Sequence, residues 1–257
     1  MLRDFQNNKL INLLPPLAGI AGCMIVGGGI YESATHYIGS GFYSPENHFI
    51  SELGLSTSTT MAHVFNRSLN IAGFLLMIFV IGLGRFLGNG YAARAGIVTG
   101  ITATVSFSAV GYFTAADWLQ HMIAASIFFA GAMLTVSFFV FAILHDTQKR
   151  LHRVHVLHGI LIVACYFIAL LWPKDLMWQM TNDPAHFVRP SIWAITLLEW
   201  GYCLLICTWI CMVSLNLLYQ SLLESRTVIF LTGKQLYREY NTRAHQAMTW
   251  INKNFRL

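Results

Sequence analysis

Six long apolar runs constrain the fold of this 257-residue chain more than any other feature of its sequence. Each approaches the roughly 20 residues with which an α-helix crosses the hydrocarbon core of a bilayer. The runs are Ile11–Tyr31, Ile71–Leu87, Ala95–Thr114, Leu119–Leu144, Val156–Trp172 and Trp193–Tyr219. Charged residues make up 11% of the chain, whereas soluble domains contain about 25%. The sequence therefore predicts an all-α, polytopic membrane protein built as a six-helix transmembrane bundle.

The basic residues predict how this bundle is oriented. Of the 16 Lys and Arg residues, only Arg67, Lys174 and Arg189 fall in the segments that follow the first, third and fifth spans. Basic residues accumulate on the cytoplasmic side of membrane proteins. We therefore expect both termini to be cytoplasmic, in a bacterial-type inner membrane or a plasma membrane. The first outer loop, residues 32–69, then faces outward.

The chain divides into a six-span domain, residues 1–219, and a basic tail, residues 220–257. The apolar residues of the tail recur every three or four positions, which predicts an amphipathic helix. They are Tyr237, Tyr240, Ala244, Met248, Ile251 and Phe255. We expect this cytoplasmic helix to lie along the inner leaflet with its cations toward anionic lipid headgroups. Packing against a partner helix is the alternative.

Polar residues that could carry chemistry concentrate at the outer side. The loop and the start of the second span hold His48, Ser51, Glu52, His63, Asn66 and Asn70. Asp117 and His121, at the start of the fourth span, are four residues apart and so share one helix face. Glu199 lies about two turns inside the sixth span, where a carboxylate costs roughly 2–3 kcal/mol unless it faces the bundle interior. We expect these groups to converge beneath the outer loop.

Three functions fit such a convergence. The polar groups can form a hydrogen-bonded cluster that only fixes the loop, in a structural or regulatory subunit. They can recognise or remodel an outer-leaflet lipid by hydrolase or acyl-transfer chemistry, or they can conduct an ion or a lipid. The catalytic candidates are Glu52, His121, Ser51, Glu199 and Asp117, and the substrate-binding candidates are His48, Asn66 and Asn70. If a metal is bound, zinc on His48, Glu52, His121 and Glu199 is the hypothesis.

Other motifs have simpler interpretations. The five cysteines all lie inside apolar runs without metal-ligand spacing, so we interpret them as small packing residues. The inner membrane face accounts for the basic residues, and nothing indicates nucleic-acid binding. Gly96 and Gly100 match a helix-packing motif that fits either an internal contact or a homo-oligomer interface. Membrane lipids are therefore the partners we expect.

A family resemblance follows from the order of several motifs. Phe49-Ile50-Ser51-Glu52-Leu53-Gly54 is followed by Phe65-Asn66, then by Gly73, and later by Asp117 and His121. In this order the chain resembles the family catalogued as domain of unknown function 998, from its first span to its sixth. The resemblance implies a bundle of about six spans whose first outer loop carries the signature. It implies no particular reaction.

Overall fold

The computed structural model describes residues 9–39, 42–183 and 186–255, and within these ranges every regular element is a helix. Six helices are long and apolar enough to cross a membrane. They are α1 (Lys9–Thr35), α2 (Ala62–Leu87), α3 (Tyr91–Tyr112), α4 (Trp118–Leu144), α5 (Val154–Leu171) and α7 (Ala194–Phe255). The predicted all-α bundle with six spans is confirmed, and the protein is an integral membrane protein.

Two short helices lie outside the spans and were not predicted. One is a 3₁₀ helix, η2 (Ile50–Gly54), and the other is α6 (Asp175–Asn182), between α5 and α7. Helix α2 begins at Ala62, nine residues before the predicted span that starts at Ile71. The prediction missed these first turns because they contain polar residues. Hydropathy marks only the part of a helix that faces lipid, and it does not mark the polar turns that precede it.

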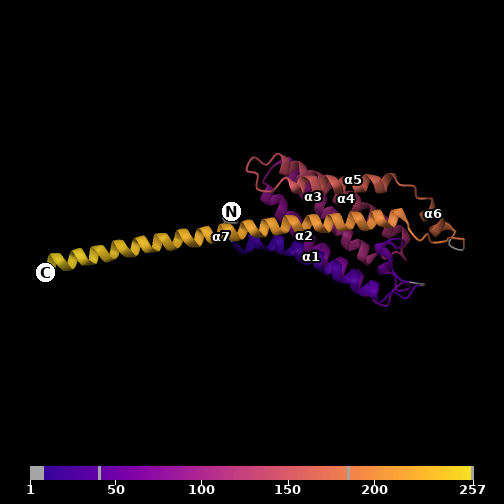
Figure 1. Ribbon diagram of the computed structural model, residues 1–257, viewed down its shortest axis with the longest axis horizontal. Coiled ribbons are helices and arrows are strands. Elements are labelled where there is room, and N and C mark those ends of the chain that lie inside the picture. Colours follow the sequence, from indigo (N-terminus) through magenta and orange to yellow (C-terminus); the bar gives the residue numbers. More distant parts are fainter. Residues whose placement is uncertain (1–8, 40–41, 184–185, 256–257) are drawn as a thin grey trace.

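The spanning helices pack mostly in chain order, and α7 closes the bundle. α1 packs against α2, α2 against α3, α3 against α4 and α4 against α5, while α7 contacts both α1 and α5 (Figure 1). The largest fully buried side chains of the core include Phe139 of α4, Ile162 of α5, and Trp209 and Val213 of α7. The end of the bundle that carries η2 and α6 is called the cap end below.

Glycines allow the helices to approach closely. A Cβ atom on Gly96 would lie 2.5 Å from the Phe139 ring, and one on Gly100 would lie 2.3 Å from Val80 Cγ1. Both residues of the Gly96-x-x-x-Gly100 motif therefore pack inside the bundle, against α4 and α2. Association with a second copy stays a prediction that these contacts do not test.

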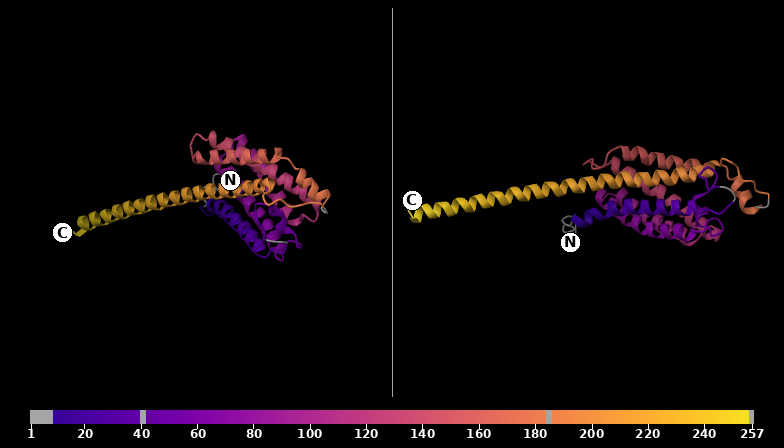
Figure 2. Two further views of the ribbon diagram at one scale, coloured as in Figure 1. Left: turned by 45° about the vertical axis from the view of Figure 1, so that its right-hand side comes forward. Right: turned by 60° about the horizontal axis from the view of Figure 1, so that its bottom comes forward.

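The last helix continues far beyond its membrane span. α7 passes the predicted domain boundary at residues 219 and 220 without a break, and it projects from the end of the bundle opposite the cap end (Figures 1 and 2). Residues 220–255 thus continue α7 in the direction of the span, and the amphipathic character of the tail stays a prediction. Of the predicted apolar stripe, only Tyr237 has a described side chain, which is exposed, and the other members lie outside the described side chains. The position of the tail along the inner leaflet stays a prediction.

An arginine locks the end of the bundle opposite the cap end. The guanidinium of Arg150, in the loop between α4 and α5, donates hydrogen bonds to the backbone carbonyls of Phe86 and Leu87 at the end of α2. Asp146 pairs with the same guanidinium at 3.1 Å, and Gln220 of α7 donates to the Arg150 carbonyl. These bonds satisfy carbonyls that a helix end leaves unpaired, so they fix α2, the loop and α7 together.

The close approach of α2 and α3 gives a testable prediction. A Cβ atom on Gly73 would lie 2.8 Å from the Thr104 backbone carbonyl oxygen, which belongs to a helix and cannot rotate away. We expect Gly73→Ala to destabilise the protein in detergent by about 1–3 kcal/mol, because it overpacks this contact. A Cβ atom on Gly27 would meet no other atom within 4 Å, so Gly27→Ala serves as the matched control. Equal thermal denaturation midpoints for the two variants would contradict the prediction.

Candidate functional site

The segment of residues 42–61 folds over the cap end and is named the cap. Thr59 Oγ1 donates a hydrogen bond to the Ser33 carbonyl oxygen at 2.8 Å, and Ser33 Oγ donates to the Met61 carbonyl oxygen at 2.8 Å. Asn66 Nδ2 of α2 donates to the Gly54 carbonyl oxygen at the end of η2, at 3.0 Å. The cap is thus fastened to α1 and to α2 by buried or half-buried polar groups.

The cap is also fastened to α7, far away in the sequence. Trp200 Nε1 donates to the His48 carbonyl oxygen at 3.1 Å, and the Ile50 backbone N–H donates to Glu199 Oε2 at 3.0 Å. The backbone N–H of Trp193 donates to the Glu46 carbonyl oxygen at 2.7 Å. These bonds place the first turns of α7 directly beneath η2.

One ion pair joins the cap to the segment between α6 and α7. Arg189 donates from its two terminal nitrogens to the two carboxylate oxygens of Glu52, at 3.0 and 2.9 Å. Glu52 Oε1 also accepts the Phe49 backbone N–H at 2.9 Å, and Arg189 donates to the Asn47 carbonyl oxygen. A bidentate ion pair of this kind fixes the orientation of both side chains as well as compensating their charges. Glu52 is therefore neutralised and held in place.

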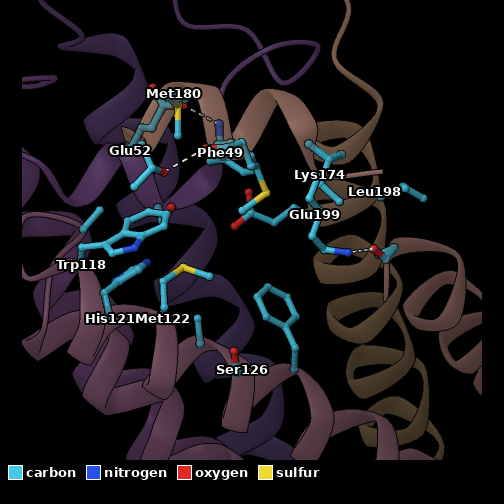
Figure 3. A pocket seen from close by; sticks show the side chains of 18 of the residues that line it. Phe49, Glu52, Trp118, His121, Met122, Ser126, Lys174, Met180, Leu198 and Glu199 are labelled. Carbon is cyan, nitrogen blue, oxygen red and sulfur yellow. Dashed lines mark hydrogen bonds between the residues drawn. The ribbon is translucent and has the colours of Figure 1, made fainter. Parts of the chain in front are cut away.

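A cavity of about 780 Å³ lies beneath the cap. Its walls come from η2, α4, the end of α5, α6 and the start of α7. Figure 3 shows Trp118, His121, Met122 and Ser126 along the α4 wall, opposite Glu199 and Leu198, with Phe49 and Glu52 on the cap side. The lining also includes Ser51, Ser58, Phe129, Ala130, Tyr166, Leu170, Lys174, Met177, Met180, Thr181, Arg189 and Tyr202. Most of these side chains are apolar or aromatic.

The cavity reaches the surface of the bundle. Trp118 of α4 and Leu170 of α5 line it and are also 39% and 51% exposed. The cavity therefore reaches the surface at the start of α4 and at the end of α5. Helix α6 covers part of it with Met177 and Met180, and no residue of α6 is buried.

His121 presents one ring nitrogen to the cavity. Its other nitrogen, Nδ1, lies 2.8 Å from the Phe113 carbonyl oxygen. A carbonyl only accepts hydrogen bonds, so Nδ1 carries the proton of the neutral ring and Nε2 is an acceptor. Nε2 has no hydrogen-bond partner among the described residues.

Glu199 presents a carboxylate oxygen to the same cavity. Oε2 accepts the Ile50 N–H, while Oε1 has no hydrogen-bond partner in the described part of the chain. Figure 3 shows this side chain pointing into the pocket. Among the described residues, no ion pair includes Glu199.

With this geometry established, comparison with known proteins identifies the family. A family model described as "Protein of unknown function (DUF998)" matches residues 17–216. The chain belongs to this family. The match confirms the resemblance drawn from the Ile50-Ser51-Glu52-Leu53-Gly54 motif, which forms η2 in the structure. No curated protein and no solved structure matches the chain.

The structure of this DUF998 protein brings some of the predicted site residues together and separates others. Ser51, Glu52, His121 and Glu199 all line the cavity. Asp117 is exposed at the start of α4 and its side chain caps no backbone N–H, so it does not share the environment of His121. The catalytic roles stay predictions.

The three predicted substrate-binding residues lie outside the cavity lining, and two of them, His48 and Asn66, hold the cap in place. His48 is buried, with Tyr37 Oη 3.1 Å from its Nε2. Asn66 holds the end of η2, and Asn70 Nδ2 donates to the Asn66 carbonyl oxygen at 2.8 Å. Their contacts in this DUF998 chain are with protein, and their predicted role toward a substrate stays untested.

The zinc hypothesis finds no grouped ligands in the described ranges. No three His, Cys, Asp or Glu side chains there are placed to hold a metal ion. Both oxygens of Glu52 bind Arg189, and the His48 ring contacts Tyr37 and Ser44. Zinc on His48, Glu52, His121 and Glu199 stays an untested prediction.

Sequence reasoning missed several residues that form the site. The sequence indicates Arg189 only as a basic residue of a predicted outer segment, because its ion pair with Glu52 joins residues 137 positions apart. Lys174, Trp118 and Tyr166 line the cavity of this DUF998 protein and were also missed. The one available signal was that Arg189 and Lys174 are two of only three outer basic residues, beside a carboxylate-rich loop.

The Glu52–Arg189 pair gives a prediction for the stability of the DUF998 fold. Arg189→Met leaves a carboxylate that is only 13% exposed without its counter-charge. We expect this variant to lose about 2–4 kcal/mol in chemical unfolding in detergent micelles. Adding Glu52→Gln should recover part of the loss, because it removes the unpaired charge and keeps an acceptor for the Phe49 N–H.

The exposed pair of Glu32 and His36 provides the control for that experiment. Both side chains are 43% exposed, so Glu32→Gln should cost less than about 1 kcal/mol. A loss for Arg189→Met no larger than that of Glu32→Gln would contradict the assigned role of the pair.

The buried imidazole of the cap predicts a pH dependence. Burial, and secondly the positive charge of Arg189, lower the pKa of His48 from its usual value of 6.5. The unfolded chain therefore binds a proton at this residue more readily than the folded chain. The stability due to His48 is complete above the unfolded pKa and is lost as the pH falls below it.

We expect the thermal denaturation midpoint to decrease as the pH is lowered from about 7.5 to about 5.5, and to decrease less in His48→Gln. His36→Gln, which changes an exposed histidine of the same face, should keep the full pH dependence. An unchanged pH dependence in His48→Gln would show that another group is responsible.

Proposed function

We propose that the protein recognises a lipid of the outer leaflet, or a related amphiphile, in the cavity beneath the cap. The observation that supports this most is the shape and chemistry of the cavity together. Its volume of about 780 Å³ falls within the roughly 300–1,000 Å³ typical of small-molecule sites, which are likewise mostly apolar with a few placed polar groups.

The position of the opening supports an amphiphile over a water-soluble ligand. The exposed part of its lining includes the apolar side chains Trp118 of α4 and Leu170 of α5. A hydrocarbon chain can enter there from lipid without crossing water. Methionines Met122, Met177 and Met180 line the interior, and such unbranched side chains adapt to flexible apolar ligands.

A second candidate function is acid–base chemistry on the bound lipid, of hydrolase or acyl-transfer type. Its support is that Glu199 Oε1 and His121 Nε2 face one cavity and that neither has a hydrogen-bond partner among the described residues. An imidazole acceptor and a carboxylate are the groups that general acid–base catalysis uses. Ser51 lines the same cavity, but no histidine hydrogen-bonds to it in the described part of the chain.

The non-enzymatic alternatives have different support. The hydrogen bonds of His48, Asn66 and Glu52 fit a structural cap, which a binding protein also requires. For conduction, the lining of the cavity extends along α7 only as far as Tyr202, and the deeper Trp209 is 2% exposed. Closely packed side chains therefore separate the cavity from the opposite end of the bundle.

Filling the cavity tests the proposal. Ala130 of α4 lines the cavity, whereas Ile127 of the same helix is 42% exposed and does not. We expect Ala130→Trp to reduce, by at least about fivefold, the amount of lipid that co-purifies with the protein and can be crosslinked to α4. The reason is that the indole would occupy the space of the ligand. Ile127→Trp, the matched control, should retain it.

Mass spectrometry of the bound lipid then separates the two candidate functions. Intact lipid with the wild type and none with Ala130→Trp supports binding. Cleaved or transferred acyl chains that disappear in His121→Gln favour the chemical function. Equal lipid occupancy in Ala130→Trp and Ile127→Trp would overturn both.

A further inference from the structure

The acidic and basic groups around the cavity differ in how many of their polar atoms have a protein partner. Four of its lining side chains are acidic or basic: Glu52, Lys174, Arg189 and Glu199. Glu52 and Arg189 neutralise each other through two hydrogen bonds. This pair therefore leaves neither a free anion nor a free cation for a ligand.

Lys174 is also occupied. Its ammonium group donates to the backbone carbonyl oxygens of Ala169, Leu170 and Trp172, at 3.4, 2.7 and 3.1 Å. An ammonium has three N–H donors, so these bonds use all of them. Its charge also offsets the negative end of the α5 dipole. An anionic headgroup would have to displace these bonds in order to bind Lys174.

Glu199 is different, because half of its carboxylate is unused. Oε2 accepts one backbone N–H, from Ile50, while Oε1 faces the cavity without a protein partner among the described residues. A carboxylate removed from bulk water is costly unless a cation or additional donors compensate it. A ligand cation placed beside Oε1 would provide this compensation.

Aromatic rings line the same space. Trp118 and Phe129 of α4, Tyr166 of α5 and Tyr202 of α7 all belong to the lining. The faces of aromatic rings attract cations, and they do so most strongly where water is excluded, as in sites that recognise quaternary ammonium groups. A carboxylate among aromatic rings is the combination that such ligands require.

We infer that the cavity selects amphiphiles whose polar end carries an ammonium group, with Glu199 as its counter-charge. This inference rests on the proposed function, since it names the chemistry of the ligand that the same cavity takes. The hydrocarbon tail lies among the methionines and toward the exposed apolar residues Trp118 of α4 and Leu170 of α5. The ammonium lies between Glu199 and the aromatic rings. An anionic phosphate in that position would face the Glu199 carboxylate, while Arg189 is paired with Glu52 and Lys174 is bound to the end of α5.

The test compares three amphiphiles that share a dodecyl tail and differ in the polar end: dodecyltrimethylammonium, dodecanol and dodecyl phosphate. The purified full-length protein, in uncharged maltoside micelles, is loaded with an uncharged fluorescent alkyl probe. Each amphiphile is then added as a competitor. We expect the ammonium compound to displace the probe at least about tenfold more effectively than dodecanol, and the phosphate to be the weakest.

Two variants test whether Glu199 causes the preference for the ammonium compound. In Glu199→Gln the side-chain amide oxygen still accepts the Ile50 N–H, so the cap contact is kept while the charge is removed. We expect the advantage of the ammonium compound over dodecanol to fall to about twofold or less. Glu32→Gln removes a carboxylate of α1 that does not line the cavity, and it should keep the wild-type ratio.

The outcomes distinguish a failure of the cavity as a binding site from a failure of the ammonium preference. If Ala130→Trp binds the probe as the wild type does, or no competitor displaces it, the proposed function fails. If all three competitors displace it equally, or the phosphate is strongest, the cavity binds amphiphiles and the ammonium inference is overturned. A preference that survives in Glu199→Gln overturns the role of Glu199. If that variant binds no dodecanol, the wild-type ratios alone decide the inference.

Discussion

The ion pair between Glu52 and Arg189 is the interaction on which the cap end depends. It joins η2, which follows the first span, to the segment that precedes the last span. Together with the bond from Ile50 to Glu199, it holds the cap over α7. Without these contacts, η2 itself would have no polar bond to α7 among the described residues, and the bonds that Trp200 and Trp193 donate to the cap backbone would hold it there. The geometry of the site therefore rests on polar contacts across the length of the chain.

The polar residues near the cap are of two kinds, which the sequence alone does not distinguish. Glu52 and Asn66 direct their hydrogen bonds to protein partners, and they position the cap. Glu199 and His121 each keep one acceptor atom directed into the cavity. The first kind satisfies buried polar groups, as any fold requires. The second kind remains available to a ligand, and both the proposed binding and the proposed chemistry depend on it.

The two ends of the bundle differ in how they are closed. At the end opposite the cap, Arg150 satisfies carbonyls of α2 directly, and the core beside it is filled by large side chains such as Phe139 and Trp209. At the cap end, α4 and the start of α7 are held apart, with α6 partly covering the space between them. The cavity beneath the cap therefore forms where short elements and loops, and not spanning helices, complete the packing.

The sequence by itself determined the membrane class, the six spans and the family. These follow from apolar runs and short motifs, which act locally and are read along the chain. It also placed Glu199 and His121 among the residues of interest, because an ionisable group inside a span must face the protein interior. Only the tertiary structure decided that Arg189 neutralises Glu52, that Asp117 stays outside, and that Lys174 and the aromatic rings complete the cavity. Pairing across 137 positions leaves no periodic pattern in a sequence, because it depends on how the packed helices bring distant segments together.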